Sequence, residues 1–117
     1  MTKGKPGYYN GKHYITYIEE VENLKRNGNL EEAERLLLEL VKATEEENKK
    51  EKMGVAPWYY EQLAIIYRKQ KYYDKEIAIL EQCAKQAPPN FVDSETAKHW
   101  GDWTIKRIEK AKLLAQK

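Results

Sequence analysis

The residue types that most often carry out catalysis or bind metals are few in this sequence and stand far apart. The two histidines are His13 and His99, and neither lies at a metal-ligand spacing from a cysteine or from the other histidine. The single cysteine, Cys83, has no partner for an internal disulfide, which favours a reducing compartment. The glycines near the start are not placed between a strand and a helix, as a phosphate-binding loop requires. We therefore expect no enzymatic activity, no metal site and no cofactor.

The first dozen residues combine cations with aromatic rings, a composition that contacts phosphates and stacks on bases. Lys3, Lys5 and Lys12 are interleaved there with Tyr8 and Tyr9. The whole chain, however, carries 21 basic and 19 acidic residues, a net charge of +2. A dedicated duplex-DNA binder carries a larger and more segregated excess of positive charge. Nucleic-acid binding through this basic arm is therefore the alternative function and not the main one.

The composition is that of a polar but folded chain. Charged residues make up 34% and hydrophobic residues 41% of the 117 positions. This mixture suits thin helical layers with solvated outer faces and seams filled by large side chains. No apolar run approaches the 18 residues of a membrane span, and the amino terminus lacks the hydrophobic segment of a signal peptide. We therefore expect a cytoplasmic protein.

Apolar residues recur at intervals of three and four along most of the chain, which predicts helices. The expected helices are separated by Asn27-Gly28-Asn29, by a charged run that ends before Pro57, and by Pro88-Pro89. The fold class is therefore all-α, in one domain with no strand. Its expected parts are a flexible arm at 1–12, a helical hairpin at 13–47, a linker at 48–56, a second hairpin at 57–88 and a final helix at 94–116.

Residues 57–89 resemble a tetratricopeptide repeat (TPR) over their whole length. The resemblance lies in Tyr60, the large-small pair Leu63-Ala64, Tyr67, Tyr73, Leu80, Cys83 and Pro88. It implies that Cys83 is a small, packed residue, so that a buried structural thiol is favoured over a nucleophile. Glu76 departs from the pattern, because the family favours a small alanine at that position. We expect Ala78, or a small rotation of the helix, to provide the close contact instead.

Residues 14–41 are similar to a weaker copy of the same repeat, through Tyr17, Leu24, Gly28, Ala33, Leu37 and Leu40. Equivalent positions, such as Leu24 and Tyr67, lie 43 residues apart, against about 34 in a regular array. The extra residues fit the charged run EEENKKEK. The final helix resembles the first half of a third repeat. The resemblance thus implies an α-α superhelix of two degenerate repeats closed by a capping helix.

Tetratricopeptide proteins bind peptides or partner proteins in a concave groove, usually without cofactor or catalysis, and the first helix of each hairpin lines that groove. The repeat register assigns the following residues of this chain to the groove: Glu22, Lys25, Arg26, Trp58, Glu61, Ile65, Arg68, Lys69, Lys98, His99, Asp102 and Lys106. Trp58 would be an aromatic anchor, or would pack against the linker instead. The resemblance therefore implies an adaptor that binds a peptide or another protein. Because two repeats form a thin core, we expect either the C-terminal helix or a second subunit, in a homodimer, to cover it.

Overall fold

The computed structural model describes residues 7–51, 57–85 and 94–116. Two short strands, β1 at Tyr8–Tyr9 and β2 at Lys12–His13, precede a 3₁₀ turn, η1, at Tyr14–Tyr17. The α-helices follow: α1 Ile18–Arg26, α2 Leu30–Glu51, α3 Pro57–Lys69, α4 Tyr73–Lys85 and α5 Ser94–Ala115. Helices make up most of the described chain, which confirms the expected all-α class. Within these ranges, no helix combines the length and the apolar character needed to cross a membrane.

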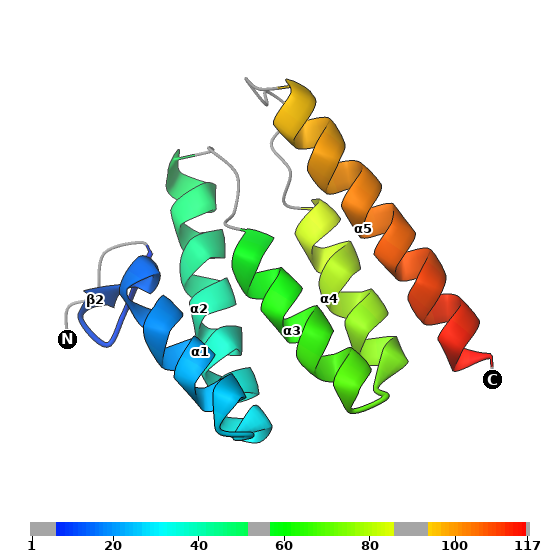
Figure 1. The fold of residues 1–117 in the computed structure, drawn as a ribbon. Coiled ribbons are helices and arrows are strands. Elements are labelled where there is room, and N and C mark those ends of the chain that lie inside the picture. The colour runs from blue at the N-terminus through cyan, green and yellow to red at the C-terminus, as the bar shows by residue number, and fades with distance from the viewer. Residues whose placement is uncertain (1–6, 52–56, 86–93, 117) are drawn as a thin grey trace.

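Successive helices lie side by side and run in alternating directions (Figure 1). Each helix contacts the next one along the chain, from α1 with α2 to α4 with α5. The pairs α1–α2 and α3–α4 therefore form two helical hairpins in series. The helix α5 packs along α4 at one end of the row, and β1 packs against α2 at the other end.

A hydrophobic core rich in aromatic rings runs between the helices. The residues that carry the resemblance to the repeat supply most of this core. Its fully buried members are Val21, Ala33, Leu37, Leu40, Tyr60, Leu63, Ala64, Ile66 and Leu80, and Tyr17, Val41, Tyr59, Tyr67, Ile79 and Cys83 are nearly so. The prediction that Cys83 is buried is therefore confirmed. Spacing of three and four residues brings these side chains onto one face of each helix, because the α-helix repeats every 3.6 residues.

The two hairpins turn in the same way. After α1, Gly28 has a φ of 78° and donates its backbone N–H to the Lys25 carbonyl, and the Asn29 N–H reaches the Leu24 carbonyl. After α3, Lys71 has a φ of 63° and donates to the Arg68 carbonyl, while the Tyr72 N–H reaches the Tyr67 carbonyl. Both patterns are Schellman C-caps, in which a left-handed residue lets two N–H groups satisfy the last helical carbonyls. Gly28 and Lys71 are 43 residues apart, the same offset that relates Leu24 and Tyr67.

The prediction that the chain has no strand is wrong for residues 8–13, which form a small antiparallel hairpin. Tyr8 pairs with His13 and Tyr9 with Lys12. The turn residues Asn10 and Gly11 have φ values of 51° and 79°. Two successive positive φ values at Asn-Gly are typical of a type I′ turn, which matches the twist of paired strands. The Tyr17 hydroxyl donates to the Tyr9 carbonyl at 2.7 Å and fastens the hairpin to the start of the helical region.

The C-terminal boundary of α2 also differs from the expected one. The charged run was expected to leave the helix after residue 47, but α2 continues to Glu51. Charged side chains are good helix formers when one face remains in water, so the run extends the helix. The last residues expected in the second hairpin, 86–88, lie outside the described residues. The predicted final helix and α5 begin at the same residue, Ser94.

Candidate binding cleft between α1 and α3

Five of the predicted groove residues line one cleft between α1 and α3. The cleft has a volume of about 290 Å³ and is lined by Glu22, Lys25, Arg26, Trp58, Gln62 and Lys69. On α1, Lys25 and Arg26 stand three and four positions after Glu22, so both lie on the same side of the helix as Glu22. On α3, Trp58 lies at the N-terminal end and Lys69 at the C-terminal end, so that the cleft follows the length of the helix. The structure thus brings together residues from both predicted repeats.

Lys25 and Gln62 join the two walls of the cleft. The Lys25 ammonium donates a hydrogen bond to Gln62 Oε1, and Gln62 is buried. Burial, followed by the charge of Lys69, lowers the pKa of Lys25, although Glu22 and Glu61 act in the opposite direction. The repeat register did not assign Gln62 to the groove. Its place four residues after Trp58 was the available signal, because that spacing puts both side chains on one face of α3.

Trp58 supplies the aromatic wall of the cleft. Its indole ring is half-buried and packs edge-on against Tyr59, with ring centroids 5.0 Å apart and an interplanar angle of 84°. The ring is therefore held by the core and still contributes to the cleft surface. A half-buried indole of this kind gives a partner side chain a rigid apolar surface at low entropic cost.

The cleft is electropositive. Its lining contains the cations Lys25, Arg26 and Lys69 and one carboxylate, Glu22. Arg26 is exposed and its guanidinium donates to the Asn23 side chain at 3.0 Å, while Lys69 is exposed at the far end. Three cations against one carboxylate leave a net charge of about +2, which complements a segment that carries carboxylates.

The other predicted groove residues lie elsewhere. Glu61 and Ile65 are half-buried on α3 and do not line the cleft. Lys106 is exposed on α5. Lys98, His99 and Asp102 fall in α5, but their side chains lie outside the described residues.

Arg68 is engaged in a buried ion cluster with Glu76 and Arg107. Glu76 is fully buried on α4, and its Oε2 lies 2.8 Å from Arg68 Nη2 and 2.9 Å from Arg107 Nε. Arg68 Nε donates to the other carboxylate oxygen at 3.1 Å, and Arg68 Nη2 donates to the Arg107 carbonyl at 3.1 Å. The Arg107–Glu76 contact is an ion pair by distance, without hydrogen-bond alignment. Burial and the nearby charge of Arg68 lower the pKa of Arg107.

This cluster corrects the expectation for the second helix of the second hairpin. Ala78 is exposed and provides no close contact. Glu76 itself occupies the buried position that Ala33, 43 residues earlier, occupies in the first hairpin. A carboxylate fits there because Arg68 and Arg107 approach it from α3 and α5, so the charge is paired instead of excluded.

Of the residues that could do chemistry, the structure describes His13 and Cys83, and both are part of the packed structure. His13 Nε2 lies 2.9 Å from Glu47 Oε2, and the Tyr14 hydroxyl donates to Glu47 Oε1 at 2.7 Å. Burial alone would raise the pKa of Glu47, but the hydrogen bonds from His13 and Tyr14 lower it overall. Burial, helped by the charge of Glu45, raises the pKa of the Cys83 thiol to about 11, so the thiol is protonated near pH 7.

The aromatic rings of the basic arm and of the turn that follows it are largely packed. Tyr9 packs on Tyr17 with ring centroids 5.7 Å apart, and Tyr14 packs edge-on against Tyr59 at 5.3 Å. Tyr8 is 40% exposed, and its ring also contacts His13. Packed rings are not open for stacking on bases, which reduces the support for the nucleic-acid alternative without testing it.

Comparisons of this chain with protein-family models, with curated proteins and with solved structures find no match.

Proposed function

We propose that this protein is a small interaction module of the tetratricopeptide kind, with two degenerate repeats and α5 as the capping helix. It binds a peptide or a segment of a partner protein in the cleft between α1 and α3. The single observation that supports this most is that Glu22, Lys25, Arg26, Trp58 and Lys69, assigned to a groove from two separate repeats, line one cleft. The matching Schellman turns, 43 residues apart, support the repeat interpretation.

The chemistry of the cleft indicates what kind of segment it binds. An apolar side chain would pack against Trp58, and a carboxylate would lie among Lys25, Arg26 and Lys69. Aromatic anchors beside charged groups are typical of binding hot spots, where truncation of the anchor costs on the order of 2 kcal/mol, or about thirty-fold in affinity.

Panning a library of random twelve-residue peptides against the immobilised chain tests this proposal. We expect the wild-type chain to enrich peptides that combine carboxylates with an apolar residue. Arg26→Glu/Lys69→Glu should abolish that enrichment, and because both side chains are exposed the variant should keep the helical circular-dichroism spectrum. A matched control, Lys110→Glu/Lys112→Glu, reverses two exposed charges on α5, outside the cleft. Failure to enrich any peptide, or equal enrichment by the charge-reversed variant, would refute the proposal.

The two other expectations from the sequence stay predictions. Nucleic-acid contact would appear as salt-sensitive retention on an immobilised polyanion that is lost when Lys3, Lys5 and Lys12 are replaced by glutamine. Homodimerisation would appear in light scattering as a doubled mass. The exposed Ile105 and Leu113 on α5, at 56% and 59%, are the side chains whose replacement by glutamate should then restore the monomer.

A further inference from the structure

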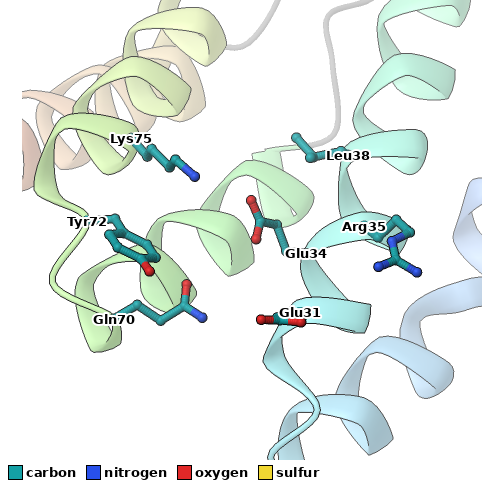
Figure 2. Close-up of a pocket in the computed structure, with 7 residues that line it drawn as sticks. All are labelled: Glu31, Glu34, Arg35, Leu38, Gln70, Tyr72 and Lys75. Atoms are coloured by element: carbon teal, nitrogen blue, oxygen red, sulfur yellow. The ribbon is translucent and has the colours of Figure 1, made fainter.

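A second and larger cleft lies on another part of the surface, between α2 and the start of α4 (Figure 2). Its volume is about 400 Å³, and its lining residues are Glu31, Glu34, Arg35 and Leu38 of α2 with Gln70, Tyr72 and Lys75 of the following hairpin. It shares no lining residue with the cleft between α1 and α3. A partner that binds in this cleft therefore uses none of the side chains that line the cleft of the proposed function.

Hydrogen-bond acceptors converge on this cleft. Glu34 is held in place by the Tyr67 hydroxyl, which donates to Glu34 Oε2 at 2.9 Å, and its carboxylate points into the cleft (Figure 2). Glu31 stands one turn earlier on the same side of α2 and points the same way. On the opposite wall, the side-chain oxygen of Gln70 is buried and has no hydrogen-bond partner among the described residues. A buried acceptor without a donor is unfavourable, so a donor that reaches this oxygen satisfies it.

The charges turned into the cleft sum to a negative value. Arg35 also lines the cleft, but its guanidinium lies on the other side of α2 (Figure 2). Lys75 points into the cleft, but its ammonium lies over the ring of Tyr72, 5.0 Å from the centroid, and 5.8 Å from that of Tyr67. Two carboxylates against this one ammonium leave about one negative charge. The cleft is therefore complementary to a cation.

The cleft also has apolar surface. Leu38 and Tyr72, which are 38% and 50% exposed, are two of the large hydrophobic side chains at the surface of the described chain. An arginine side chain matches this combination best. Its methylene stem covers apolar surface, its planar guanidinium stacks on aromatic rings, and its five N–H donors can reach acceptors on both walls.

We propose that this cleft binds an arginine side chain presented by a segment of a partner protein. The carboxylates of Glu31 and Glu34 receive the guanidinium from one wall, and the Gln70 oxygen receives one of its N–H groups from the other. Lys75 opposes the cation and so limits its affinity.

Titration of the ¹⁵N-labelled chain with acetyl-Ala-Arg-Ala-amide, followed by NMR, tests this proposal. The control peptide carries citrulline, which has nearly the same shape as arginine and no charge. We expect the arginine peptide to shift the side-chain amide resonances of Gln70 with a Kd on the order of a millimolar, and the citrulline peptide to bind more weakly. Equal shifts with both peptides, or none with the arginine peptide, would overturn the proposal.

Three variants make the test specific. Glu31→Gln should weaken arginine binding about three-fold, as the loss of one exposed charge pair does. Glu32→Gln, the neighbouring exposed carboxylate that does not line the cleft, should leave binding unchanged. Lys75→Met should strengthen binding about three-fold, because it removes a like charge. If Lys75→Met weakens binding, Lys75 does not oppose the bound cation and the assignment is wrong. Arg26→Glu/Lys69→Glu should not affect this titration, so the two proposals can fail separately.

Discussion

Replacing Glu76 with alanine leaves Arg68 and Arg107 facing each other without the carboxylate that lies between them. Two arguments predict opposite results. By analogy with Ala33, which fills the same position in the first hairpin, alanine should fit well and the chain should be at least as stable. By the electrostatics of the structure, the variant loses the counter-ion of two partly buried guanidinium groups, so the chain should be less stable.

The structure gives the magnitude. Removing one partner of a buried ion pair costs about 3–5 kcal/mol, because the remaining charge is left uncompensated. The side chains of Arg68 and Arg107 are 28% and 19% exposed, so water screens part of this charge and the lower end applies. We expect Glu76→Ala to lower the free energy of unfolding by about 3 kcal/mol. For a chain of 117 residues, this corresponds to a fall of about 12 °C in Tm.

Urea unfolding followed by circular dichroism measures this change. Glu81→Ala, an exposed carboxylate on the same helix, is the matched control and should change stability by less than about 0.5 kcal/mol. The double variant Glu76→Ala/Arg107→Leu should recover part of the loss, because it removes one of the two facing cations. A Glu76→Ala protein as stable as the wild type would refute the electrostatic reasoning and favour the repeat analogy.

Three further predictions concern other parts of the fold. Lys71→Gly should stabilise the chain by about 0.5–1 kcal/mol in urea unfolding, because glycine adopts the left-handed C-cap conformation without strain. Lys71→Ala, which keeps the strain, should not stabilise the chain. Tyr60→Phe should cost about 1.5 kcal/mol in the same assay, since it removes a 2.6 Å hydrogen bond to the Glu45 carboxylate from a fully buried ring. In the folded chain the pKa of Glu47 lies below its ordinary value of 4.5. Its hydrogen bond with His13 therefore stabilises the chain fully above about pH 4.5, and this stabilisation is lost as the pH falls through the folded pKa. The stability gap between wild type and Glu47→Gln should therefore narrow below about pH 4.5, and a gap that stays constant from pH 7 to 3 would contradict this.

The helices and most of the core could be predicted from the sequence because their determinants are local. Apolar spacing identifies the buried face of each helix, and Gly28 marks the first turn by its own conformational preference. The N-terminal hairpin has a local signal too, the Asn10-Gly11 pair. It was missed because the surrounding lysines and glycines are typical of an irregular segment. Two paired residues per strand are too few to show the alternation of a longer sheet.

The candidate cleft could be predicted only in part. A repeat register assigns residues to about half of the circumference of a helix, whereas the cleft uses only part of that face. Glu61 and Ile65 lie on the assigned helix but outside the cleft, and Gln62, which the register did not assign, lines it. The side chain of Arg68 is drawn toward Glu76, eight residues later in the sequence. Sequence spacing does not predict this contact, because the contact depends on how α4 packs against α3.

The position shared by Ala33 and Glu76 shows how similar hairpins make different contacts. At Ala33 the first hairpin is closed by a small apolar side chain. At Glu76 the second hairpin presents a carboxylate to an arginine of α5, beside the packed Trp103 and Ile108. Apolar surfaces tolerate sliding, but a buried ion pair costs several kcal/mol when its partners separate. The helix α5 is therefore held in one register along α4. Exchanging the two residues, Ala33→Glu with Glu76→Ala, should destabilise both hairpins, because the first hairpin has Lys25, already bonded to Gln62, where the second has Arg68.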